Sequence, residues 1–352
     1  MTRRRLSAAA AALAGFWLCA AVVRVLPLVR NGRALAAASN LDVGHALLTA
    51  VNGPGVDPAW RMPIGPLLET AMILGSPRFG VIVVATVVGL DALITGALAA
   101  YLGGPAAGLA AAAAWLWLLA EIPPNAGSIK MMLYAFFVML AAFGLALRAR
   151  APSPRADLSA GAALAAGFLM RSVLLPLCPL VALWSLIRGK PYSAALFLLP
   201  AVLLLAPWAQ FNRSVNGSWT IAENGTADLL LIGGSLGLTD TTPEGDAGVL
   251  VPDAPKGHGV AAWAIRRAAA HPIEFVQLAW ARLRYAVGLE PILVATALLG
   301  FILRRRDPAA RALALVAAAF LGVHASVATL AYLYEPLWPL LCALAAASLA
   351  AL

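Results

Sequence analysis

Long apolar runs separated by short polar segments dominate the chain, and they predict membrane-spanning helices. Several runs approach the roughly 20 residues that a helix needs to cross the hydrocarbon core. The expected spans lie at about 6–28, 79–101, 106–122, 131–147, 193–209, 289–303, 312–331 and 336–352. Residues 159–187 are also apolar, but Arg171, Pro176 and Pro179 interrupt them, which predicts two short or broken helices. We therefore expect an all-α integral membrane protein, a polytopic helical bundle of about eight to ten spans forming one domain over residues 1–352.

Two long polar segments interrupt this pattern and are expected outside the cytoplasm. The first is an external loop at 29–62, followed by PIGPLLETAMILGS at 63–76. That stretch is too short to cross a bilayer and carries Glu69, so we expect an interfacial or re-entrant helix. The second is a large external loop at 210–287, whose second half predicts amphipathic juxtamembrane helices.

Composition and charge agree with the membrane prediction. The chain is 62% apolar and 12% charged, whereas a soluble domain is about half apolar and a quarter charged. The net charge of +9 would suit a nucleic-acid-binding protein, but the basic residues form short clusters between apolar runs, as the positive-inside rule predicts. The clusters at 3–5, 148–155, 188–190 and 304–311 are therefore assigned to the cytoplasm, together with an N-terminus held by an uncleaved first span.

The first external loop contains the main candidates for acid–base chemistry. A membrane enzyme that uses a lipid-carried phosphosugar outside the cytoplasm needs a carboxylate to accept the proton of the attacking hydroxyl. Asp42 suits this role by position, although the residues alone favour a cap for the short helix expected over LDVGHALLTAV. His45 lies on the same helical face, and Asp57 stands in the turn-rich GPGVDPAW. A purely structural role remains open for both.

Such a reaction also needs cations to stabilise the leaving phosphate. Arg61 precedes the expected interfacial helix and Lys130 begins a span, although both could instead reach lipid headgroups. Arg171 lies deep in an apolar stretch, where a cation is costly unless it is paired or used. Its structural alternative is an ion pair with Asp91. The histidines and cysteines form no metal-ligand cluster, and a divalent metal stays open.

Several motifs follow one another along nearly the whole chain. RMPIGPLLE follows Asp42, EIPPNAGSIK closes a later span, and MRSVLLPL contains Arg171. PWAQFNRSVNGSWTIAENGTADLLLIGGS carries Asn224 and Asp228, and YLYEPLWPLLCALAA lies near the end. Together they resemble the GT-C membrane glycosyltransferases, in particular the bacterial branch with the aminoarabinose transferase of lipid A and the protein mannosyltransferases.

The resemblance implies inverting transfer of a sugar from a polyprenyl-phosphate donor to an acceptor at the external face of a bacterial inner membrane. Asp42 would be the catalytic base. The implied substrate-binding residues are Arg61, Lys130, Arg171, Arg213, Asp57, His45, Asn224 and Asp228. The expected partners are membrane lipid, the lipid-linked sugar, an acceptor lipid, glycan or protein, and a possible membrane-protein partner, with no nucleic acid and no certain cofactor beyond the donor.

Departures from the family pattern keep other functions open. Phe211 stands where the family usually has an arginine, and the ending lacks the arginine of Arg-Tyr-x-x-Pro. A catalytically degenerate GT-C-like structural or assembly subunit is therefore the alternative. A transporter or flippase is less favoured, because only Asp91 and Arg171 could line a route across the midplane and no internal repeat is evident.

Overall fold

The computed structural model describes residues 3–30, 62–121, 129–217, 219, 221–222, 232, 234, 260–327 and 331–349. All regular secondary structure in these residues is helical, so the all-α prediction is confirmed there. Many helices begin with a proline in the first turn, where its fixed φ suits the helix and its missing N–H costs no hydrogen bond. The helices are α1 (Arg3–Arg30), α3 (Ile64–Leu74), α4 (Pro77–Gly103), α5 (Pro105–Glu121), α6 (Ile129–Arg150), α7 (Pro154–Met170), η4 (Ser172–Leu174), α8 (Leu177–Ile187), α9 (Pro191–Asn216), α12 (Val260–Ala270), α13 (Pro272–Leu289), α14 (Pro291–Leu303), α15 (Pro308–Val327), α16 (Ala331–Tyr334), η5 (Glu335–Leu337) and α17 (Trp338–Leu349).

Five of the described helices are long and apolar enough to cross a membrane, which supports a membrane protein. They are α1 from Ala10, α4, α6, α9 and α15. A sixth span results if α13 and α14, which meet at 98°, count as one broken span. This is fewer than the eight to ten spans expected. The expected spans at 106–122, 289–303 and 336–352 correspond to α5, α14 and α17, whose described helices have only 17, 13 and 12 residues.

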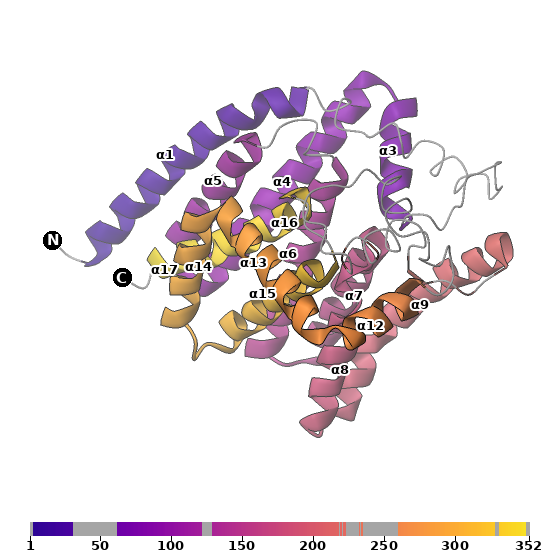
Figure 1. Cartoon of the computed structure of the whole chain (residues 1–352). Coiled ribbons are helices and arrows are strands. Elements are labelled where there is room, and N and C mark those ends of the chain that lie inside the picture. The colour runs from indigo at the N-terminus through magenta and orange to yellow at the C-terminus, as the bar shows by residue number, and fades with distance from the viewer. Residues whose placement is uncertain are drawn as a thin grey trace.

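The helices pack around α6 and α17. α6 packs against α4, α7 and α15, and α17 packs against α4, α5 and α14. Figure 1 shows α1 lying along the outer side of α5, which is its main neighbour. The buried interior is almost entirely apolar, with many alanines, and this composition lets helix backbones approach closely.

Glycines mark the closest helix crossings. A Cβ added at Gly161 of α7 would lie 2.0 Å from the carbonyl oxygen of Phe197 in α9. A Cβ at Gly108 of α5 would lie 2.7 Å from the carbonyl oxygen of Gly96 in α4. Small residues at such crossings are the usual means by which membrane helices associate. The α7–α9 and α4–α5 pairs therefore depend on glycine at these positions.

The break expected near Arg171 is present. α7 ends at Met170, and Arg171 has an extended backbone with φ −154° and ψ 137°. The short η4 helix follows, and α8 begins at Leu177 immediately after Pro176. The extended residue turns the chain and places the Arg171 side chain inside the bundle, where it is 4% exposed.

Candidate functional site

Most of the site residues predicted from the sequence lie outside the described residues, and their roles stay predictions. They are Asp42, His45, Asp57, Arg61, Asn224 and Asp228. The structure does place Lys130, Arg171 and Arg213. All three stand at helix ends, Lys130 near the start of α6, Arg171 just after α7, and Arg213 in the last turn of α9.

Lys130 and Arg171 lie close together beneath α3, although different helices carry them. A Cβ built on Gly65 of α3 would lie 3.2 Å from Cγ and Cδ of Lys130 and 3.3 Å from Cε of Met170. Arg171 follows Met170 directly, and its guanidinium lies 3.9 Å from Sδ of Met131, the neighbour of Lys130. We call this region, where α3 covers the ends of α6 and α7, the α3 end of the bundle. It brings together two of the cations proposed to bind phosphate.

Arg171 has no carboxylate partner among the described residues. The ion pair with Asp91 considered from the sequence is wrong, because both carboxylate oxygens of Asp91 are buried without a hydrogen-bond partner. The physical reason is the extended backbone at Arg171, which directs its side chain toward Met131 on α6. A thioether is only a weak acceptor for a guanidinium. The buried charge of Arg171 therefore still lacks a full counter-charge within the described part of the chain.

Arg213 has a different environment from Arg171. It is exposed, and its guanidinium carbon lies 4.7 Å from the centre of the Trp219 ring, a cation–π contact. Phe211, which stands where the family usually has an arginine, stacks on Trp208 with ring centres 5.7 Å apart. Trp208 in turn packs with Phe168 of α7. The end of α9 therefore lies near the α3 end, but it contributes an apolar stack and an outward cation.

A buried histidine that the sequence analysis did not single out lies near Arg171. The ring of His324 stacks on Phe320 at 4.2 Å and lies 5.6 Å from Tyr334. Its Nδ1 is 2.9 Å from the carbonyl oxygen of Phe320, whereas its Nε2 is buried without a hydrogen-bond partner. Arg171 is close enough to act electrostatically on this ring. His324 therefore adds a buried imidazole to the neighbourhood of Arg171.

Glu335 follows Tyr334 at the start of η5, which packs against α6. Its side chain is 7% exposed, and burial raises its pKa to about 7. A carboxyl with a pKa near neutrality can accept or release a proton at working pH. Glu335 is therefore a titratable group of the described chain that the sequence analysis did not consider.

Arg282 of α13 is, like Arg171, a buried arginine, and the sequence analysis did not single it out. It is fully buried and donates to the carbonyl oxygens of Ala325 at 3.1 Å and Gly234 at 2.6 Å. Ala325 lies in the last turn of α15, where backbone carbonyls lack intrahelical donors. A Cβ at Gly234 would lie 2.0 Å from the carbonyl oxygen of Val327, so glycine permits this close approach. Arg282 therefore ties α13, Gly234 and the end of α15 together.

The sequence does contain a signal for two of the missed residues, Arg282 and His324. Arg282 lies four residues from Leu278 and from Ala286, so it occupies the inward face of an amphipathic helix. His324 lies four residues after Phe320 and eight after Val316, on the buried face of α15. A polar side chain on an otherwise apolar helix face indicates a specific contact, and this periodicity was available from the sequence.

Comparison with protein-family models, curated proteins and solved structures finds no match to this chain. The resemblance to GT-C glycosyltransferases therefore rests on the spaced motifs of the chain itself.

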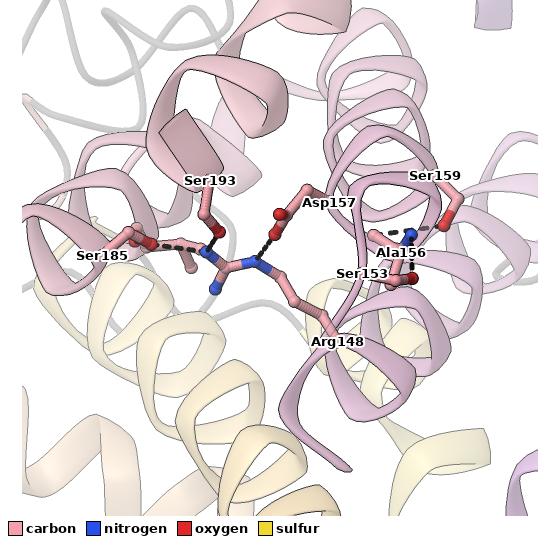
Figure 2. A network of polar contacts seen from close by, with 8 residues as sticks. Arg148, Ser153, Ala156, Asp157, Ser159, Ser185 and Ser193 are labelled. Atoms are coloured by element: carbon pink, nitrogen blue, oxygen red, sulfur yellow. Dashed lines mark hydrogen bonds and ion pairs between the residues drawn. The ribbon is translucent and has the colours of Figure 1, made fainter. Parts of the chain in front are cut away.

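The opposite end of the bundle contains a different polar network, built around Arg148 (Figure 2). Arg148 donates from Nε to Asp157 at 2.5 Å and from Nη2 to the hydroxyls of Ser185 at 2.5 Å and Ser193 at 3.0 Å. These four residues come from α6, α7, α8 and α9. Because its hydrogen bonds all go to side chains of the bundle, the network holds four helix ends together and is assigned a structural role.

Proposed function

We propose that the protein is a GT-C-like inverting glycosyltransferase that moves a sugar from a polyprenyl-phosphate donor to an acceptor at the external membrane face. The observation that carries this proposal is the buried guanidinium of Arg171, beside Lys130 and without a carboxylate partner in the described residues. A buried cation is costly unless a counter-charge is present. A phosphate group would supply that charge, and positioned cations stabilise a phosphate as it leaves.

The segment that contains Asp42 and Arg61 leads directly into this region. Met62, the first described residue after that segment, is 1% exposed and packs with Phe168 of α7 and Trp208 of α9. Arg61, one of the proposed phosphate ligands, therefore directly precedes in sequence a residue that packs near the α3 end. In this proposal Asp42 accepts the proton of the acceptor hydroxyl, which attacks the anomeric carbon as the phosphate leaves.

Binding of the donor tests whether Arg171 is a phosphate ligand. The purified protein in lipid nanodiscs should bind a fluorescent polyprenyl-phosphate sugar, and Arg171→Met should weaken that binding by at least about tenfold, the effect of losing a charge-assisted contact. Arg171→Lys should keep part of the affinity. Arg188→Met is the matched control, because Arg188 is exposed and stacks on Trp184 at 4.4 Å. Equal binding by all of these proteins would reject Arg171 as a phosphate ligand.

A sugar-transfer assay separately tests whether Asp42 is the catalytic base. Asp42→Asn should bind the donor as the unaltered protein does and lose transfer, because an amide cannot accept the proton. Near-full transfer by Asp42→Asn would remove Asp42 from that role. Loss of donor binding in this variant would instead assign the Asp42 segment to substrate binding.

One observation favours a GT-C-like structural or assembly subunit as the second candidate. Phe211 occupies an arginine position of the family and is used in an apolar stack with Trp208. A subunit that no longer handles a phosphosugar would tolerate this replacement. Stable co-purification with a membrane-protein partner, together with no binding of any polyprenyl-phosphate sugar, would support this candidate over the enzyme.

A further inference from the structure

Helix α13 has an orientation that separates it from the spans. It meets α14 at 98°. α14 packs along α17, within the group that also contains α4 and α5. If α14 follows the direction of these spans, α13 lies roughly in the plane of the membrane. α13 also carries Glu274 and Arg284 on its exposed side, and such charges are costly in the hydrocarbon core but not at the interface.

The outward face of α13 is an apolar stripe. Ile273, Val276, Trp280 and Val287 follow one another at spacings of three, four and seven residues and are 74%, 64%, 58% and 38% exposed. Residues at this spacing lie on one face of a helix. Trp is typical of the membrane interface, where its ring contacts lipid and its N–H contacts water. α12 adds Ile265, which is 67% exposed. None of the described helices covers this stripe.

The charges of the outward surface are mainly basic. Arg266 of α12 and Arg284 of α13 are exposed, and neither makes an ion pair within the described residues. Glu274 is the acidic residue of these two helices. Arginine side chains bordering an interfacial apolar face attract anionic headgroups and can extend their apolar stems along lipid. This charge favours an anionic lipid leaflet as the occupant over a neutral one.

We propose that α12 and α13 form an in-plane arm that docks on an anionic lipid leaflet, with Val276 and Trp280 at acyl-chain depth and Arg266 and Arg284 at the lipid phosphates. The inward face of the same arm is held by Arg282, whose hydrogen bonds reach Ala325 and Gly234. Lipid contact on one face of α13 is therefore linked to the end of α15, one turn from His324. This docking does not depend on sugar transfer.

Spin-label accessibility tests the depth of the arm. The three native cysteines, Cys19, Cys178 and Cys342, are first replaced by alanine. Single labels are then placed with Val276→Cys and Trp280→Cys in nanodiscs of phosphatidylcholine with phosphatidylglycerol. Leu203→Cys on α9, at a position 63% exposed within a span, is the hydrocarbon reference. Arg306→Cys, in the polar turn after α14, is the water reference.

The two arm labels should be readily accessible to oxygen and poorly accessible to a water-soluble nickel chelate, at a depth between the two references. Removing phosphatidylglycerol should raise their accessibility to nickel. The double variant Arg266→Gln, Arg284→Gln should show the same rise in nanodiscs that still contain phosphatidylglycerol. Nickel accessibility equal to that at Arg306 would place the arm in water and overturn the proposal. Inaccessibility to both reagents would show a protein partner on this face and also overturn it. No response to phosphatidylglycerol would overturn the anionic preference.

Discussion

Replacement of Arg148 should destabilise the protein more than replacement of any single partner in its network. Arg148→Met removes three hydrogen bonds at once and leaves the Asp157 carboxylate buried without its cation. Asp157→Asn removes only the charge on one side, and Arg148 keeps the hydroxyls of Ser185 and Ser193 as acceptors. The two variants therefore test whether the network acts through charge or through its several bonds.

The burial of this ion pair sets the expected magnitude. The side chains of Arg148 and Asp157 are 13% and 8% exposed. Removing one partner of a buried pair costs about 3–5 kcal/mol, which we expect for Arg148→Met. Asp157→Asn should cost less, about 1.5–3 kcal/mol, the value of a hydrogen bond to a charged group. Replacing both residues by apolar side chains should restore much of the loss, because no uncompensated charge remains.

Unfolding in mixed micelles with increasing dodecyl sulfate, followed by tryptophan fluorescence, ranks these variants by stability. Arg150→Met is the matched control. Arg150 pairs with Asp307, but its side chain is 34% exposed, so the pair is screened and should contribute only about 0–1 kcal/mol. Equal midpoints for Arg148→Met and Arg150→Met, or a larger loss for Asp157→Asn than for Arg148→Met, would refute the reasoning.

Two further predictions concern packing and pH. Gly161→Ala should destabilise the protein by about 3 kcal/mol in the same unfolding assay, because its Cβ would meet the Phe197 carbonyl. Gly89→Ala, where a Cβ meets nothing within 4 Å, should be neutral or slightly stabilising, and equal effects would contradict the close approach. For Glu335, burial raises the folded-state pKa from 4.5 to about 7, so the folded state binds more protons in this range and stability should fall as pH rises through it. Glu335→Gln should remove this part of the pH dependence, and an unchanged pH profile would contradict the assignment.

Local sequence signals predicted several elements well. The apolar run at 79–101 corresponds to α4, which begins at Pro77. The side chain of Ser76 caps this helix by accepting a hydrogen bond from the backbone N–H of Phe79. The break near Arg171 was also predictable, because Pro176 and Pro179 limit helix continuation and a charge interrupts the apolar run. These features depend on residues close together in the chain, so a single sequence contains the information.

Features that depend on tertiary packing were predicted less well. α9 continues through Pro200 and Pro207 to Asn216, beyond the expected end, and stops where Gly217 adopts a left-handed conformation. α5 matches the predicted range at 106–122 closely, but its 17 residues are fewer than the roughly 20 that a span needs. The association of Arg171 with Met131 instead of Asp91 depends on how α7 ends, which hydropathy does not encode.

The pairing of α1 with α5 has a consequence for biosynthesis. Arg24 of α1 forms an ion pair with Glu121 of α5, a residue 97 positions later. At synthesis rates of about 5–20 residues per second, α1 precedes this partner by about 5–20 s. During that interval the helix must reside in the bilayer with its arginine solvated by headgroups or water. The strongly apolar stretch from Ala10, only 22% buried in the folded bundle, suits a helix that is inserted before its neighbour is made.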